Sequence, residues 1–220
     1  MKRMLDVLVS ALGLVVLSPF IALMALLICL DSRGPAFYGQ QRIGRDGVPF
    51  TLWKFRSMHD RINEDVHRSA ALEWFRGRPT GELKPDADPR VTRLGKYLRR
   101  SNLDELPQIF NVLKGEMSLV GPRPMMPYDR PNYEAWYFER EVVRPGMTGL
   151  WQVSGRHSLS AVQMMALDVR YVREWSWWLD LKILARTFPT VLSDLRPAKQ
   201  EIAAPEEVPH DDANREFQTT

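Results

Sequence analysis

The longest apolar segment of the chain lies near its N-terminus. Residues 7–30 read VLVSALGLVVLSPFIALMALLICL, about 24 residues without a charged side chain, which is enough to cross the hydrocarbon core of a bilayer as a helix. A secretory signal peptide has a shorter apolar core followed by a small-x-small cleavage site, and this segment has neither property. The pattern therefore predicts a membrane helix that occupies residues 1–32 together with its charged flanks.

Two features predict that this helix enters the membrane and returns to the same side. Ser18-Pro19 lies near its middle, where proline removes a main-chain hydrogen bond and a serine hydroxyl can satisfy the carbonyl that is freed. Basic residues flank both ends, Lys2 and Arg3 before the helix and Arg33 after it, whereas positive charge normally marks only the cytoplasmic side. A re-entrant helix removes this conflict, and a plain spanning helix is the alternative.

After this segment the pattern changes to a period of two. Residues 37–58, FYGQQRIGRDGVPFTLWKFRSM, alternate apolar and polar side chains around Arg45-Asp46-Gly47, a turn sequence, and so predict a β-hairpin. Residues 59–89 are charged and contain GRPTGELKPDADP, which is typical of a surface loop.

A basic amphipathic helix is predicted next. It should begin at Asp88-Pro89, with the aspartate as N-cap and the proline in the first turn. Apolar and basic side chains then recur at helical spacing on different faces through residue 100. Such a helix can rest on anionic lipid or can expose a solvated basic face, and the membrane helix upstream favours the first interpretation.

Residues 133–143, 160–175 and 174–188 are periodic enough to predict further helices. The last of these places Trp175, Trp177 and Trp178 beside basic residues, which suits a membrane interface, with core packing as the alternative. The predicted fold class is therefore α+β and mainly helical. It comprises an N-terminal re-entrant membrane helix (residues 1–32), a main domain with a small β-hairpin and amphipathic interfacial helices (residues 33–195), and a disordered acidic tail (residues 196–220).

The composition narrows the classes of function. A formal net charge of +3 over 220 residues is too mild to require nucleic acid as a partner. The single cysteine, Cys29, excludes a disulfide framework and a thiolate zinc site. The four histidines are scattered, and no glycine-rich nucleotide-binding motif is present. Candidate chemistry must therefore come from carboxylates and arginines.

Two adjacent carboxylates lie in SNLDELPQ, residues 101–108. Ser101-x-x-Asp104 resembles a capping box, and Asp104 could itself be the N-cap of a helix with Pro107 in its first turn. Alternatively, Asp104 is a nucleophile toward phosphorus, kept ionised by main-chain N–H groups and by nearby Arg99 or Arg100. Together with Glu105 it could also hold a divalent cation, preferably Mg²⁺ where phosphates are involved. The residues alone leave both interpretations open.

Arginines follow at positions that suit phosphate binding. Arg123 lies between two prolines in SLVGPRPMMP, which stiffens its main chain, and the planar guanidinium can bind phosphate through two hydrogen bonds. Arg144 and Arg156 lie in RPGMTGLWQVSGRH, where glycines let the main chain approach a ligand closely. An acidic pair, fixed arginines and a membrane helix together indicate phosphoryl chemistry at a bilayer surface.

The chain resembles the bacterial sugar transferases, which are monotopic phosphoglycosyl transferases, from about residue 2 to residue 195. The resemblance lies in KRMLD, the Ser18-Pro19 break, KFRSM, DPRVTRLGKYLRRSNLDELPQIFNVLKGEMSLVGPRP, RPGMTGLWQVSGR and DVRYVREWSWWLDLKIL. It is similar above all to the exopolysaccharide hexose-1-phosphate transferases. His157 stands where the family usually has asparagine after GR, so this loop does not indicate which sugar is used.

The resemblance implies an enzyme that transfers a hexose 1-phosphate from a UDP-sugar to undecaprenyl phosphate, releasing UMP through a phosphosugar ester of Asp104. Glu105 would act as a base or help to hold Mg²⁺. The arginines would bind phosphate or shape the nucleotide–sugar pocket: Arg56, Arg99, Arg123, Arg144 and Arg156. The reaction would be the first membrane step of exopolysaccharide, capsule or O-antigen assembly, at the cytoplasmic face of the bacterial inner membrane. The sugar and the formation of a homodimer are left open.

Two other classes of function compete with this interpretation. A membrane-anchored glycosyltransferase that releases UDP would need a D-x-D metal motif, and DAD at residues 86–88 matches the letters but lacks the βαβ alternation of such enzymes. A non-enzymatic scaffold that binds lipid head groups would explain the membrane helix and the arginines, but not the adjacent carboxylates. The nucleotide product, UMP, UDP or none, distinguishes the three.

Overall fold

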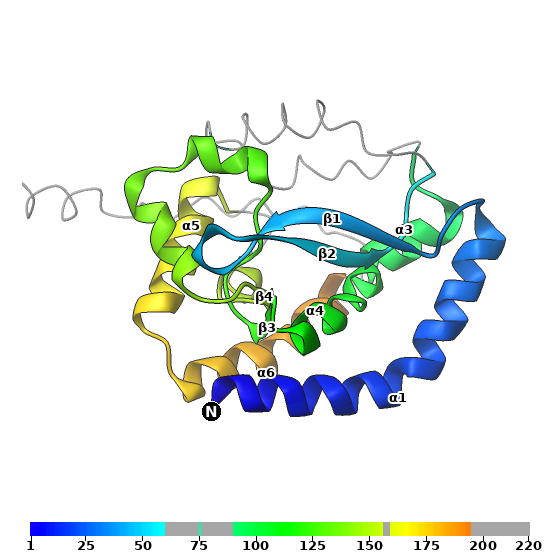
Figure 1. Cartoon of the computed structure of the whole chain (residues 1–220), viewed down its shortest axis with the longest axis horizontal. Coiled ribbons are helices and arrows are strands. Elements are labelled where there is room, and N and C mark those ends of the chain that lie inside the picture. The colour runs from blue at the N-terminus through cyan, green and yellow to red at the C-terminus, as the bar shows by residue number, and fades with distance from the viewer. Residues whose placement is uncertain (60–74, 76–89, 156–158, 195–220) are drawn as a thin grey trace, which may run out of the picture.

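The computed structural model describes residues 1–59, 75, 90–155 and 159–194. Figure 1 shows a body of short helices and strands with one long helix, α1, wrapped along its edge. Asp88, Pro89, Arg156, most of the predicted 59–89 loop and the predicted tail lie outside the described residues. The helices and strands are α1 (Lys2–Asp31), β1 (Phe37–Ile43), β2 (Pro49–Phe55), α3 (Arg93–Arg100), α4 (Gln108–Lys114), β3 (Ser118–Val120), β4 (Gly146–Thr148), α5 (Ala161–Arg173) and α6 (Trp177–Asp194).

Helix α1 bends about halfway along its length (Figure 1), and Pro19 lies inside it. Proline has no N–H to donate to the carbonyl four residues earlier, which belongs to Val15. The hydroxyl of Ser18 donates to that same carbonyl at 2.9 Å. The Ser18-Pro19 pair therefore bends the helix as its sequence predicts, and the carbonyl that the bend frees keeps a hydrogen-bond donor.

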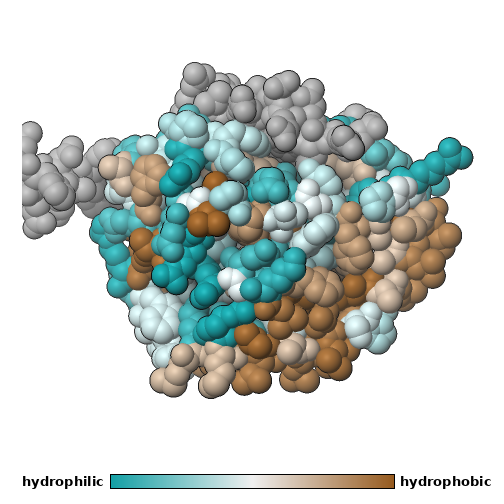
Figure 2. Space-filling model, viewed as in Figure 1, coloured by the Kyte–Doolittle hydropathy of each residue, from teal (hydrophilic) through white to brown (hydrophobic). Residues whose placement is uncertain are grey.

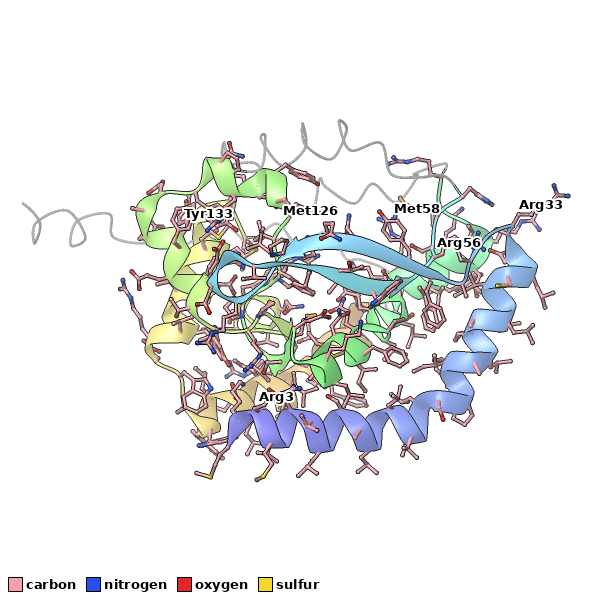
Figure 3. The ribbon with its side chains drawn as sticks, viewed as in Figure 1. Arg3, Arg33, Arg56, Met58, Met126 and Tyr133 are labelled. Atoms are coloured by element: carbon pink, nitrogen blue, oxygen red, sulfur yellow. The ribbon has the colours of Figure 1, made fainter. Side chains whose placement is uncertain are left out.

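The N-terminal end of α1 is fixed to the body by its two basic residues. Lys2 forms an ion pair with Asp180, near the start of α6. Arg3 donates to the carbonyls of Val112 and Leu113 in the last turn of α4, where its positive charge also complements the helix dipole. Figure 3 shows Arg3 between α1 and the body.

The C-terminal end of α1 is fixed to the same body. Asp31 accepts a hydrogen bond from the main-chain N–H of Leu94, at the start of α3, at 3.2 Å. The guanidinium of Arg56 lies beside the last turn (Figure 3) and donates to the carbonyls of Ile28 at 3.3 Å and Ser32 at 2.7 Å. Both ends of the apolar helix therefore contact one folded body.

The two faces of α1 differ in their surroundings. Ile21 and Ile28 pack inward with Phe55 and Leu98 in one of the hydrophobic cores. The outer face forms a continuous apolar strip along the bent helix (Figure 2). Its exposed large side chains are Met4, Leu5, Leu8, Val9, Leu12, Val15, Val16, Leu23, Leu26, Leu27 and Leu30. Such an extended apolar surface marks an interaction site rather than ordinary solvent-exposed surface.

The predicted hairpin is confirmed. β1 and β2 are antiparallel with Phe37 opposite Phe55. Asp46 and Gly47 in the connecting turn have φ angles of 57° and 75°, a left-handed conformation that glycine adopts readily and aspartate tolerates better than most residues. Asn111 of α4 joins the edge of β2 by accepting from the main-chain N–H of Trp53 at 3.0 Å. This contact sets α4, and the segment before it, against the hairpin.

The structure differs from the predicted local structure at two segments, and it contains one element that was not predicted. Helix α3 begins at Arg93 with Thr92 as its N-cap, whose side chain accepts from the Gly95 N–H at 2.8 Å; the predicted start at Asp88-Pro89 lies outside the described residues. The segment predicted as a helix at residues 133–143 forms a 3-10 helix over Ala135–Val142 instead. The parallel pair β3–β4 was not predicted at all.

Candidate active site

Asp104 and Glu105 lie in a single 3-10 turn, Leu103–Glu105, between α3 and α4. Asn102 before it adopts a left-handed conformation with a φ of 56°. Helix α4 begins only at Gln108, and Pro107 occupies its N-cap position without a side-chain hydrogen bond. Asp104 is therefore not the N-cap of α4, and the capping interpretation of this residue is wrong. The half-buried turn presents two adjacent carboxylates ahead of the N-cap position of α4.

Glu105 contacts a cation from the hairpin. Its Oε1 lies 3.3 Å from Nζ of Lys54 on β2, and the two side chains are only 17% and 16% exposed. Partial burial makes an ion pair stronger than at an open surface, because fewer water molecules screen it. This contact fixes the carboxylate turn relative to the sheet.

Behind Glu105 lies a small hollow that is partly open to solvent. We call it the cationic hollow, because three basic side chains but only one carboxylate line it. Its lining residues are Arg42, Leu52, Lys54, Glu105, Gln108, Arg123, Pro124, Gly146, Met147 and Gln152. Since Lys54 already contacts Glu105, the two arginines carry the excess positive charge.

Arg42 is the most buried cation of the hollow. Its guanidinium donates to the Pro124 carbonyl at 3.0 Å and to Oε1 of Gln40 at 2.8 Å, and no carboxylate of the described residues lies within ion-pair distance. Burial, followed by repulsion from Arg123, lowers the pKa of Arg42 to about 10. A buried cation with neutral partners is a favourable site for a ligand anion, because the anion supplies the missing counter-charge.

Arg123 projects into the same hollow from the GPRP segment. Its guanidinium carbon lies 5.5 Å from the ring centroid of Trp151, a cation–π arrangement that holds the flexible side chain over the ring. Proline on either side fixes the φ angles of the neighbouring residues. The predicted residues Glu105 and Arg123 are thus brought together at one hollow, with Asp104 adjacent to Glu105 in the chain.

Other predicted arginines lie elsewhere. Arg144 donates to the Gly115 carbonyl at 2.7 Å, at the C-terminal end of α4, and Arg56 bonds the end of α1 as described above. Arg99 lies in the last turn of α3, five residues before the catalytic candidate Asp104. Arg156 lies outside the described residues. The phosphate-binding roles of these four arginines stay predictions.

Arg42 and Lys54 were not among the predicted site residues. Their strands pair so that Gln40 lies opposite Leu52, Arg42 opposite Phe50 and Lys54 opposite Tyr38. Residues directly opposite each other, and every second residue along a strand, lie on the same face of the sheet. The predicted hairpin therefore already indicated that Arg42 and Lys54 lie on one face. The sequence held no indication that this face would meet the carboxylate turn.

The carboxylate turn fits Mg²⁺ by the chemistry of its donors. Among the described residues, no group of three or more His, Cys, Asp or Glu side chains forms a ready metal cage. Mg²⁺ does not require one, because it commonly binds one or two carboxylates and completes its shell with water and substrate phosphates. Asp104 and Glu105 could supply those carboxylates.

Comparisons with known proteins identify relatives along almost the whole described chain. A model of the family "Bacterial sugar transferase" matches residues 1–194. The exopolysaccharide production protein ExoY of Sinorhizobium fredii is 42% identical over 195 residues, 86% of this chain and 84% of that protein. The UDP-glucose:undecaprenyl-phosphate glucose-1-phosphate transferase of Caulobacter vibrioides is 44% identical over 87% of this chain and 70% of its own length. The undecaprenyl-phosphate galactose phosphotransferase of Salmonella typhimurium is 40% identical over 87% of this chain but only 40% of its own length.

Proposed function

The chain belongs to the bacterial sugar transferase family, and we propose that it transfers a hexose 1-phosphate from a UDP-sugar to undecaprenyl phosphate with release of UMP. The observation that supports this most strongly is the position of the Asp104–Glu105 turn beside the cationic hollow. Two of the relatives compared above are named for the transfer of glucose 1-phosphate or galactose phosphate to undecaprenyl phosphate. The reaction would serve as the first membrane step in the assembly of exopolysaccharide, capsule or O-antigen.

The cationic hollow would bind the diphosphate of the UDP-sugar. Arg42 and Arg123 together lack a carboxylate partner among the described residues, and a diphosphate would supply the compensating negative charge. Guanidinium groups suit this role, because their planar donors match two phosphate oxygens at once. Glu105 at the rim would then lie close to the phosphate that carries the sugar.

Two displacements account for the reaction. The Asp104 carboxylate attacks the phosphorus that bears the sugar, the bond to the bridging oxygen breaks, and UMP leaves with that electron pair. An oxygen of undecaprenyl phosphate then attacks the same phosphorus and releases the carboxylate. Glu105 orients or deprotonates the incoming group, and Lys54 holds Glu105 in place. Mg²⁺ held by Asp104 and Glu105 would supply charge neutralisation for the phosphates when it is bound.

The acceptor and the protein would meet at the cytoplasmic surface of the bacterial inner membrane. Both ends of α1 contact the same body, and the bent helix presents an apolar outer strip. A re-entrant helix satisfies both observations, because its two ends return to one side. Trp175, Trp177 and Trp178 are exposed at the start of α6, where they would lie at the interface with lipid.

The nucleotide product tests the proposal. Detergent-purified protein is incubated with Mg²⁺, undecaprenyl phosphate and each of a panel of UDP-sugars, including UDP-galactose, UDP-glucose and N-acetylated hexoses. We expect UMP with at least one donor and a matching lipid-linked sugar phosphate. Release of UDP would indicate transfer of the sugar alone, and no product with any donor would favour a lipid-binding scaffold. Arg123→Gln should reduce UMP formation, whereas Arg130→Gln, in the same region but outside the hollow, should not.

A further inference from the structure

A buried ion pair lies behind the cationic hollow without lining it. Arg140, in the 3-10 helix Ala135–Val142, and Asp168 in α5 have side chains only 3% and 0% exposed. The Nε of Arg140 lies 3.1 Å from Oδ2 of Asp168, and a second nitrogen of the same guanidinium bonds the same oxygen. Tyr133 accepts a third hydrogen bond from the guanidinium at 3.1 Å.

The remaining contact of Arg140 is with the GPRP segment. Its Nη2 donates to the main-chain carbonyl of Arg123. The next carbonyl, that of Pro124, accepts from Arg42 at 3.0 Å. Two buried guanidinium groups therefore hold two successive peptide units of the segment that carries the Arg123 side chain into the hollow.

Mere attachment of α5 to the preceding 3-10 helix does not explain this arrangement. A buried ion pair contributes little net stability, because desolvation offsets its attraction. The same two elements are already joined by an exposed pair, Arg173 with Glu139, whose side chains are 63% and 40% exposed. The distinguishing feature of the buried pair is its bond to the Arg123 main chain.

We infer that Arg140 and Asp168 are positioning residues for donor binding: Asp168 orients Arg140, and Arg140 fixes the peptide of Arg123 so that its guanidinium meets the diphosphate. This inference rests on the proposed function, because it assigns Arg123 to the UDP-sugar. A small displacement of a binding group can cost a large part of its effect, on the order of a hundredfold for 1 Å in an active site. Loosening the main chain at Arg123 should therefore weaken diphosphate binding.

The test measures UDP affinity by calorimetry with Mg²⁺ in wild type, Asp168→Asn, Arg123→Gln and the double variant. Asp168→Asn should bind UDP at least about tenfold more weakly than wild type. On the Arg123→Gln background, the same substitution should cause no further loss, because the group it positions is gone. Glu139→Gln removes the exposed pair between the same elements and should bind UDP as wild type does.

Arg140→Lys provides a second variant in case Asp168→Asn does not fold. Lysine keeps a cation near Asp168, but its side chain ends one bond short of the position of Nη2, the nitrogen that bonds both Asp168 and the Arg123 carbonyl. Arg140→Lys should therefore also weaken UDP binding, and only when Arg123 is present. Unchanged affinity in these variants, or equal losses on both backgrounds, would overturn the inference while leaving the proposed function intact. Wild-type protein that neither binds UDP nor releases UMP would instead count against the proposed function.

Discussion

The contact between Arg56 and the end of α1 gives a quantitative prediction. The guanidinium donates to the Ser32 carbonyl at 2.7 Å, to the more distant Ile28 carbonyl at 3.3 Å and to the exposed carbonyl of Arg33. Hydrogen bonds from a charged group contribute about 1.5–3 kcal/mol each. The bond to Ser32 should contribute fully, whereas the longer bond to Ile28 and the exposed bond to Arg33 should contribute only in part. We therefore expect Arg56→Met to lower the free energy of unfolding by about 2–4 kcal/mol.

A shift of the unfolding temperature measures this effect. For a domain of this size, 2–4 kcal/mol corresponds to about 5–15 °C, which thermal unfolding in detergent resolves easily. Gly34→Ala should act in the same direction: its Cβ would lie 2.3 Å from Nη1 of Arg56, and Gly34 has a φ of 121°. Arg45→Gln, which removes an exposed ion pair with Asp46 at the hairpin turn, is the control and should change the unfolding temperature little.

The same variant separates this structural role from phosphate binding. If Arg56 only holds the end of α1, the folded fraction of Arg56→Met should use the UDP-sugar with an unchanged KM. An unfolding temperature equal to that of wild type, together with a KM at least about tenfold higher, would refute the anchoring role and support Arg56 as a phosphate ligand.

Two further predictions concern topology and pH. In a Cys29→Ser background, a cysteine placed at the N-terminus and one placed at Val48 should both resist labelling from the periplasm. Adding Pro19→Leu and Ser18→Ala should straighten the helix and expose the N-terminal cysteine to the label. Periplasmic labelling of the N-terminal cysteine without these two substitutions would exclude a re-entrant helix. Burial raises the pKa of Tyr133 to about 12, so between pH 10 and 12 the unfolded tyrosine loses its proton while the folded one keeps it. The free energy of unfolding should therefore fall across this window, by at most about 2–3 kcal/mol more in wild type than in Tyr133→Phe. Denaturant unfolding at several pH values measures this, and an equal decrease in the two proteins would contradict the prediction.

Elements with local signals could be predicted from the sequence. The bend of α1 depends on Ser18 and Pro19 alone, and the hairpin depends on alternation around one turn. The pair β3–β4 left no such signal, because each strand has only three residues and its partner is distant in the chain. Over two or three turns, a 3-10 helix such as Ala135–Val142 shows nearly the same spacing of buried residues as an α-helix, so its type could not be read from the pattern.

The residues of the candidate site likewise fall into those that a local motif predicts and those that only tertiary packing brings in. Adjacent Asp104 and Glu105, and Arg123 between its prolines, are visible in short motifs. Arg42 and Lys54 join them only because α4 docks on the edge of β2, and that contact depends on tertiary packing. Arginine is equally suited to phosphate and to main-chain carbonyls, so its presence in a glycine-containing loop could not indicate which of the two it would bind.

In the proposed mechanism, Asp104 carries the phosphosugar between the two substrates. The direct measurement is the intact mass of the protein after incubation with Mg²⁺ and a UDP-sugar that supports turnover, without undecaprenyl phosphate. We expect wild type to gain the mass of a phosphohexose on the peptide containing SNLDELPQ, to release up to one equivalent of UMP, and to lose the adduct when undecaprenyl phosphate is added. Asp104→Asn should give no adduct, because an amide is not a nucleophile, while Asp46→Asn at the exposed hairpin turn should behave as wild type. UMP release that requires both substrates at once, with no adduct on wild-type protein, would contradict a covalent intermediate on Asp104 and favour direct transfer.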